Sequence, residues 1–251
     1  MALMRTANPA LNAKTFEGVV GRTGMVGMMT VEGTVNKTGI LLLCVVATAA
    51  WTWSRFARAE NPAEVVPYIL IGAIGGFLAA LLTIFKKDWS PVTSPIYGLL
   101  EGMMLGGISA FYEMQFQGIV IQAVLLTLGV TCALLFAYRS KIIQATENFK
   151  LGVFAATGGT ALIYVIGWIM NIFGAGVPYI HESGAIGIGF SLFVVVIASL
   201  NLVLDFDFIE QGAAQGAPKF MEWYAAFGLM VTLIWLYLEM LRLLSKLRSR
   251  R

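Results

Sequence analysis

The chain has 251 residues, of which 58% are hydrophobic and only 12% are charged. A soluble globular domain carries about 25% charged residues, so this composition excludes a soluble domain and predicts an integral membrane protein whose main partner is the lipid bilayer. The formal net charge is +3, and the basic residues cluster near the ends of apolar segments. That distribution is typical of membrane topology and not of a nucleic-acid-binding surface, so no nucleic-acid partner is expected.

Residues 1–36 are mixed and polar. They lack the compact apolar stretch and small-residue cleavage site of a secretory signal peptide. We interpret residues 1–36 as an N-terminal cytoplasmic tail and residues 37–251 as a transmembrane domain.

Seven apolar segments follow this tail. They are expected at residues 38–53, 65–85, 94–111, 118–137, 151–173, 185–208 and 225–244. A spanning helix needs about 20 residues, and lipid cannot satisfy an unpaired backbone, so each segment is expected to be helical. The first and third segments are short unless their polar flanks are included. The sequence therefore predicts an all-α membrane protein with seven transmembrane helices.

The lysines and arginines between the segments predict the orientation. If the N-terminus is cytoplasmic, Lys86, Lys87 and Arg139 fall on the cytoplasmic side, while the opposite loops carry only Arg55 and Arg58. This distribution follows the positive-inside rule. The basic tail from 242 to 251 is the exception. It lies outside if the last segment crosses the membrane and inside if that segment re-enters, and the sequence leaves both open.

Two glycine pairs, Gly72 with Gly76 and Gly102 with Gly106, are each spaced by four residues. This spacing places each pair on one helix face, where neighbouring backbones approach closely. We interpret these faces as packing surfaces within the chain, and a dimer interface is the alternative.

The sequence gives no support for an enzyme. It contains no GxSxG, HExxH, P-loop or glycine-rich dinucleotide motif, and it has a single histidine. Asp205 and Asp207 lie two apart on one expected helix, so they point to nearly opposite faces and cannot form a protease dyad. Asp205 and Glu239 could meet across two helices, but the flanking motifs of aspartyl intramembrane proteases are absent. We expect no catalytic residue and no cofactor, and the question of a metal site stays open.

Acids inside apolar segments are costly to bury and are candidates for function. Asp205 shares a helix face with Asn201, one turn earlier, and is the candidate for burial. Asp207 lies closer to the segment end, where water is available. Both aspartates belong to the string LNLVLDFDFIEQ, from Leu200 to Gln211.

Two further acids lie in other segments. Glu239 stands three residues before Arg242, so a local ion pair is the alternative to a functional role. Glu101 lies in the third segment, and a structural hydrogen bond to a neighbouring helix is its alternative. If Asp205 and Glu239 meet, the two carboxyls tend to share a proton. Loss of that proton leaves two adjacent negative charges, which repel each other and attract a divalent cation, so such a pair can gate a path as pH changes.

The strings LNLVLDFDFIEQ and IWLYLEMLRLL resemble the signature of the Bax inhibitor-1 family, the transmembrane Bax inhibitor motif proteins. The string MTVEGTVNKTGILLL, from Met29 to Leu43, resembles a bacterial branch of that family. The resemblance implies six helices around a central C-terminal helix, with a pair of acids acting as the pH sensor of a calcium leak. Asp205 matches the aspartate of the sixth helix. Glu239 falls where the family usually has an aspartate, and its extra methylene group lengthens its reach.

The link between the sixth and seventh segments is expected to be longer than in simpler members of that family. It contains Gln211, Gly216, Pro218 and Glu222.

These observations together predict a pH-sensitive cation leak channel, with Ca2+ as the expected ion and Asp205 and Glu239 as the gate. Secondary candidates for the site are Asp207, Glu101, Asn201 and Arg242. The alternative is a membrane interaction protein that does not transport and instead modulates a membrane protease or quality-control complex. The expected location is a bacterial inner membrane, with the N-terminus in the cytoplasm.

Overall fold

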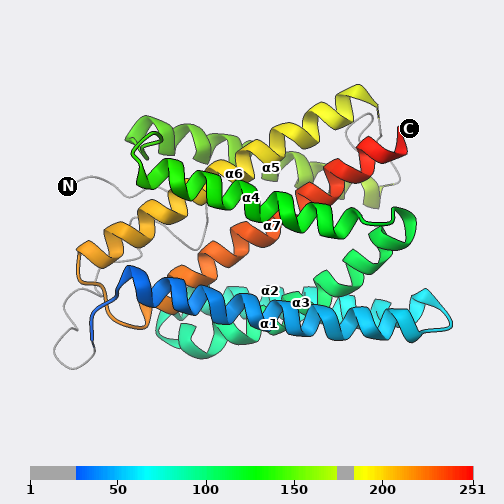
Figure 1. Ribbon diagram of the computed structural model, residues 1–251, viewed down its shortest axis with the longest axis horizontal. Helices are drawn as coiled ribbons and strands as arrows, with labels where there is room; N and C mark the ends of the chain where they lie inside the picture. Colours follow the sequence, from blue (N-terminus) through cyan, green and yellow to red (C-terminus); the bar gives the residue numbers. More distant parts are fainter. Residues whose placement is uncertain (1–26, 174–183, 251) are drawn as a thin grey trace. The chain divides into compact units, whose positions relative to one another are not determined.

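The computed structural model describes residues 27–173 and 184–250, in which helices are joined by short connections (Figure 1). Its seven α-helices are α1 (Val31–Arg58), α2 (Val66–Phe85), α3 (Ser90–Gln115), α4 (Ile119–Arg139), α5 (Glu147–Ile172), α6 (Ala185–Ala214) and α7 (Met221–Ser249). Two short 3-10 helices, η3 (Pro62–Val65) and η4 (Lys87–Trp89), precede α2 and α3. The described residues contain no β-strand. The predicted all-α, seven-helix fold is confirmed.

The apolar pattern located the helices but placed the start of the first one too late. α1 begins at Val31, so residues 31–36 of the expected tail belong to a helix, and residues 1–26 lie outside the described residues. The reason is local. The Thr30 side chain accepts a hydrogen bond from the amide of Gly33, and Glu32 lies in the first turn, where the helix dipole favours an acid. A capped first turn can be polar, and hydropathy alone does not detect it.

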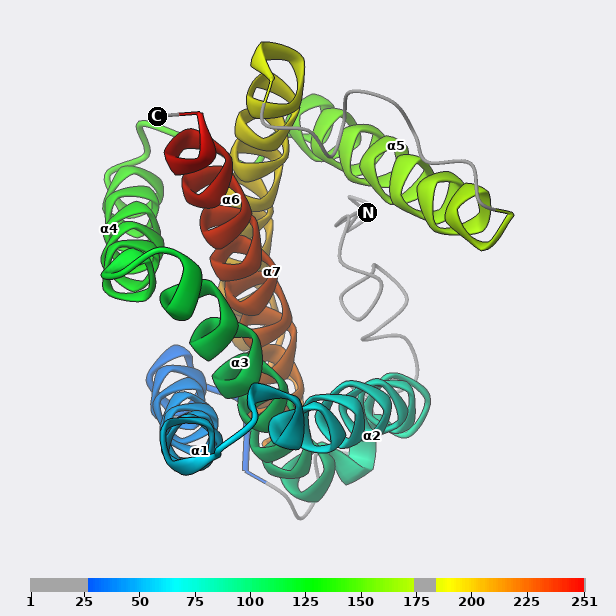
Figure 2. The same cartoon turned by 90° about the vertical axis from the view of Figure 1, so that its right-hand side faces the viewer.

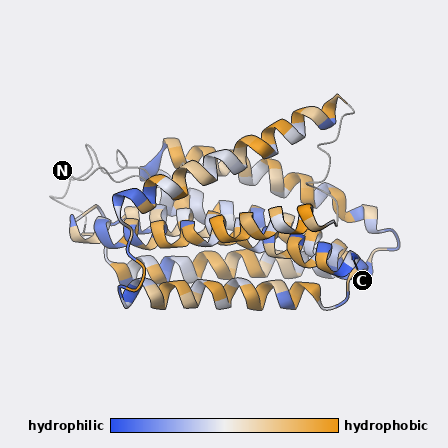
Figure 3. Ribbon diagram, turned by 90° about the horizontal axis from the view of Figure 1, so that it is seen from above, coloured by the Kyte–Doolittle hydropathy of each residue, from blue (hydrophilic) through white to orange (hydrophobic). Residues whose placement is uncertain are grey.

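Six helices are long and apolar enough to cross a membrane, namely α1, α2 with η3, α4, α5, α6 and α7. The other helix, α3, has 26 residues but is not among these six. Figure 3 shows apolar residues along most of each helix and polar residues mainly near the helix ends and in the connections. The chain is therefore a multi-pass membrane protein.

The described residues form two compact units. Unit 1 contains residues 118–173, 184–206 and 232–250, and unit 2 contains residues 27–117 and 207–231. The boundary divides α6 and α7, so each unit holds a part of both helices. In the apolar stretches of α6 and α7, 56% of the residues are buried, against 17–22% in α1, α2, α4 and α5. The C-terminal helix, for which the resemblance implied a central position, thus shares the deepest burial with α6.

The last helix is a single unbroken coil of 29 residues (Figure 2). A segment that enters the membrane and returns on the same side needs a break in the helix, and α7 has none. Its length and composition are those of a crossing helix. Crossing is therefore favoured over re-entry for the seventh segment.

The glycine pairs pack helices together within unit 2, as interpreted from their spacing. A Cβ atom on Gly102 would lie 2.3 Å from the carbonyl oxygen of Val45, and one on Gly106 would lie 2.3 Å from that of Ala49. A Cβ on Gly72 would lie 2.6 Å from the carbonyl oxygen of Leu100. Both α1 and α2 therefore approach the backbone of α3 too closely for any side chain at these positions.

This packing generates a stability prediction. We expect Gly106→Ala to destabilise the protein by about 1–3 kcal/mol, because the added methyl group meets backbone atoms that cannot move independently. Gly129→Ala is the matched control, since Gly129 of α4 faces open space and alanine is the better helix former by about 0.5–1 kcal/mol. Thermal unfolding in detergent measures both variants. Equal melting temperatures for the two would contradict the packing described for α1 and α3.

Candidate functional site

Asp205 lies in α6 and is completely buried, together with its neighbours Leu202 and Val203. Asp207 is partly exposed and accepts a hydrogen bond from the side chain of Gln211, one turn later. The two aspartates therefore differ in burial as their positions in the sequence predicted. Nothing in this contrast assigns a role to Asp205, which stays a prediction.

Asn201 joins α6 to α5 one turn before Asp205. Its side-chain nitrogen Nδ2 donates to Thr157 Oγ1 at 2.8 Å and to the carbonyl oxygen of Ile197 at 2.9 Å. Asn201 thus uses both donors in contacts that hold the two helices together. Asp205 lies four residues later on the same face of α6, so these contacts also fix the face that carries Asp205.

Glu239 of α7 is 2% exposed and lies in a compact polar group with Tyr164 and Arg242. Its Oε1 atom accepts from the Tyr164 hydroxyl at 2.9 Å and from Arg242 at 2.8 Å. Arg242 also donates to the Tyr164 oxygen at 2.6 Å, and its guanidinium lies 5.1 Å from the centre of the tyrosine ring. The local ion pair between Glu239 and Arg242, the alternative predicted from their spacing, is confirmed.

Tyr164 was missed by the sequence reasoning. The available signal was a tyrosine in the middle of the apolar part of α5, because a buried tyrosine hydroxyl usually has a hydrogen-bond partner. The second oxygen of Glu239, Oε2, is buried and has no hydrogen-bond partner among the described residues. Glu239 thus has one oxygen in the ion pair and one buried oxygen without a hydrogen bond in the described part of the chain.

The basic residues at the end of α7 are engaged inside unit 1. Lys246 is buried and donates to the carbonyl oxygen of Gly187 at 3.0 Å and to Ser191 Oγ at 2.9 Å. Arg248 donates to the side-chain oxygen of Gln122 on α4 at 2.8 Å. Together with Arg242, these side chains anchor the end of α7 to α4, α5 and α6. These basic residues therefore have a role in packing, whichever side of the membrane the tail lies on.

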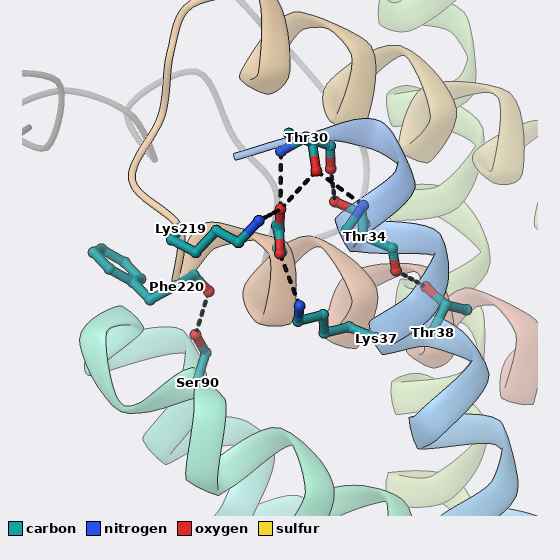
Figure 4. Close-up of polar contacts among 9 residues, drawn as sticks. Thr30, Thr34, Lys37, Thr38, Ser90, Lys219 and Phe220 are labelled. Carbon is teal, nitrogen blue, oxygen red and sulfur yellow. Dashed lines mark hydrogen bonds and ion pairs between the residues drawn. The ribbon is translucent and has the colours of Figure 1, made fainter. Parts of the chain in front are cut away.

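A second buried acid lies at the start of α7, in unit 2, where Thr30, Lys37 and Lys219 gather around it (Figure 4). Glu222 is completely buried, and its Oε1 atom accepts from the Thr30 amide at 3.0 Å and from the Thr30 hydroxyl at 2.9 Å. Two lysines complete the group. Lys219 lies 2.7 Å from Oε1, and Lys37 lies 3.0 Å from Oε2. We call Thr30, Lys37, Lys219 and Glu222 the Glu222 clamp.

The Glu222 clamp holds the first turn of α1 against the first turn of α7. A Cβ atom on Gly33 would lie 1.9 Å from Glu222 Oε1, so the glycine makes room for the carboxyl. The carboxylate lies at the N-termini of two helices, where their dipoles favour negative charge. Sequence reasoning placed Glu222 in a long link and missed this role. The signal for it was an acid in the first turn of a helix, three residues after a lysine.

The link between the sixth and seventh segments is shorter than the apolar pattern indicated, and its length relative to the family members that the sequence resembles stays a prediction. α6 continues to Ala214 and α7 begins at Met221, so Gln211 and Glu222 are both helical and the link spans residues 215–220. Main-chain contacts fix this short link, because Met29 donates to the carbonyl oxygen of Ala217 at 2.7 Å. The polar residues at both helix ends satisfy one another locally, which allows the helices to extend beyond the apolar pattern.

Glu101 of α3 is 8% exposed and lies against Gly76 of α2. Its Oε2 atom is buried and has no hydrogen-bond partner among the described residues. For Glu101, a structural hydrogen bond was the alternative to a functional role, and Oε2 does not make one to any described residue. Within the described residues, no three His, Cys, Asp or Glu side chains are grouped closely enough to hold a metal ion.

The Glu222 clamp generates a second stability prediction. We expect Glu222→Gln to cost about 1.5–3 kcal/mol, because it removes the charged group that accepts hydrogen bonds from Thr30 and pairs with Lys37 and Lys219. Glu60→Gln, at an exposed position of unit 2, is the matched control and should stay within about 0.5 kcal/mol of the natural chain. Thermal unfolding in detergent measures both. A loss no greater than that of the control would show that the clamp does not stabilise the fold.

Comparison with known proteins gives one match. A family model described as Bax inhibitor 1 like matches residues 6–249. No curated protein and no solved structure matches the chain. The family match includes all seven helices and the segments that contain Asp205 and Glu239. Because it covers nearly the whole chain, the protein belongs to the Bax inhibitor 1 like family.

Proposed function

We propose that the protein is a non-enzymatic cation leak channel of the membrane, with Ca2+ as its ion, and that protonation of Asp205 and Glu239 gates it. One observation carries the proposal. Two carboxyls, on α6 and α7 of the same unit, are 0% and 2% exposed in a multi-pass membrane protein. Membership of the Bax inhibitor 1 like family supports the same function.

The energetic argument starts from the cost of burial. An acid within a membrane helix is expensive, and such acids usually face a neighbouring helix, a partner or a pathway. A buried carboxyl also responds to pH, because proton uptake removes the charge that is costly to bury. Hard cations such as Ca2+ take carboxylate oxygens as ligands. Ionised Asp205 and Glu239 would therefore attract Ca2+, and their protonated forms would not.

Arg242 pairs with one of the two acids of the proposed gate. Its guanidinium donates to Glu239 Oε1 at 2.8 Å, so the carboxylate already has a positive partner. A cation that binds Glu239 must compete with that guanidinium or use the oxygen Oε2, which has no hydrogen-bond partner in the described part of the chain. Protonation of Glu239 would remove the charge that holds Arg242 in place. The ion pair thus couples the protonation of the acid to the position of a basic side chain.

The proposed location is a bacterial inner membrane with the N-terminus in the cytoplasm. Lysines in the connection between α2 and α3 support this orientation under the positive-inside rule, and so does Arg139 at the end of α4.

The test is Ca2+ entry into proteoliposomes loaded with a fluorescent indicator, measured across about pH 5–8, where perturbed carboxyls titrate. We expect the natural chain to show a flux that varies with pH. Asp205→Asn and Glu239→Gln should each flatten that dependence, because each removes one carboxyl while preserving size and shape. Asp207→Asn is the matched control, since it makes the same chemical change two residues away on a partly exposed side chain.

Two results would contradict the proposal. Flux equal to that of empty liposomes at every pH would remove the channel and favour the alternative, docking to a membrane protease or quality-control complex. A pH dependence that survives both Asp205→Asn and Glu239→Gln would keep the channel but remove the gate. Thermal unfolding of each variant, compared with the natural chain, separates these outcomes from simple misfolding.

A further inference from the structure

Unit 2 contains a buried acid that the proposed gate does not use. Glu101 lies near the middle of α3 and is 8% exposed, and its Oε2 atom is fully buried without a hydrogen-bond partner among the described residues. Lipid and packed helices offer no water to such an oxygen. A carboxylate in this position would bear the full cost of desolvation, whereas a neutral carboxylic acid would bear far less.

The glycine face of α2 is shaped around this carboxyl. A Cβ atom on Gly76 would lie 2.7 Å from Glu101 Oε1, so the missing side chain leaves the space that the acid occupies. One turn earlier, Gly72 brings the two backbones together at the level of Leu100 and Met104. The close approach of α2 to α3 therefore encloses the carboxyl without supplying a charge.

The two long helices α1 and α2 that pack on α3 supply no charge at this level, and α7 contacts α3 here through the uncharged Phe227, its nearest acid being Glu222, more than one turn earlier. α2 has no charged residue between Val66 and Phe85, and its tyrosine, Tyr68, packs edge-on against Trp51 with the ring centres 5.2 Å apart. α1 faces α3 there with Cys44 and Thr48, of which only the thiol can titrate.

On α3 itself, Tyr97 lies one turn before Glu101. It is buried, and its ring packs edge-on against Phe227 of α7 at 4.9 Å. Tyr97 is thus the titratable group nearest to Glu101 along the helix. A tyrosine is neutral at physiological pH, so it does not compensate a negative charge on the acid.

We propose that Glu101, enclosed by the glycine face of α2, is a proton-binding site of unit 2 that is distinct from Asp205 and Glu239. The carboxyl is a neutral acid when the proton is bound, and it releases that proton as the pH rises. The ligand is H+ alone, because a single carboxyl without further oxygen ligands does not make a Ca2+ site. This site does not depend on the proposed channel function.

The test is the infrared carbonyl band of protonated carboxylic acids, recorded on the full chain in lipid across about pH 5–10, a range that covers exposed and buried carboxyls. The difference between the natural chain and Glu101→Gln isolates the band of Glu101. We expect a band that shifts on transfer to heavy water and disappears as the pH rises.

Two glycine variants test the enclosure. Gly76→Ala places a methyl group against Oε1 and should shift the midpoint of this titration. Gly75→Ala makes the same change one residue away, where the new methyl meets only the side chain of Leu100, and it should leave the midpoint unchanged.

Each outcome decides the proposal. Absence of a Glu101 band at every pH would show an ionised residue and overturn it. A band that persists unchanged over the whole range would show a permanently neutral structural acid and also overturn it. Both results are independent of Ca2+ flux, so failure of this site and failure of the proposed channel are distinguishable.

Discussion

The cost of placing a carboxyl in a membrane protein interior is the constraint on which this structure depends. Glu222 meets that cost with two lysines and the first turn of α1, and Glu239 meets it with Arg242 and Tyr164. Glu101 has an oxygen with no hydrogen-bond partner among the described residues and lies against a glycine. Glu222, which two lysines compensate, holds the starts of α1 and α7 together. For Glu101 and Glu239, which each have one buried oxygen without a hydrogen bond among the described residues, proton exchange is the role that we propose.

Much of the fold follows from local rules that the sequence displays. Seven apolar segments predicted seven helices, because lipid forces each one to satisfy its own backbone. The glycine pairs predicted close helix approach, because a spacing of four residues places small residues on one face. The helix ends were less predictable. α1 starts within polar sequence because Thr30 caps it, and α6 and α7 extend into the expected link because Gln211 and Glu222 find partners nearby. Hydropathy does not register such side-chain contacts.

The candidate site likewise has features that the sequence predicted and partners that it did not. The burial of Asp205 and the ion pair of Glu239 with Arg242 follow from helical spacing, which a sequence shows directly. Tyr164, Thr30 and Lys37 were not predictable as partners, because each belongs to a helix distant in sequence from the acid it contacts. The basic tail illustrates the point. Charge counting alone left its side of the membrane open, whereas the contacts of Lys246 and Arg248 show that its charges hold helices together.

The central claim is that Asp205 and Glu239 both gate one cation path in response to pH. The two acids lie at different levels of unit 1, because Leu204 packs on Val153 of α5 whereas Glu239 accepts a hydrogen bond from Tyr164 of the same helix. Val153 and Tyr164 are about 16 Å apart along α5, given the helical rise of ~1.5 Å per residue. The most direct measurement is therefore Ca2+ entry into proteoliposomes for the double variant Asp205→Asn with Glu239→Gln, compared with each single variant. If both acids act on one path, the double variant should lose no more of the pH dependence than the more severe single variant. A pH dependence that is equal to that of the natural chain in the double variant would contradict the gate.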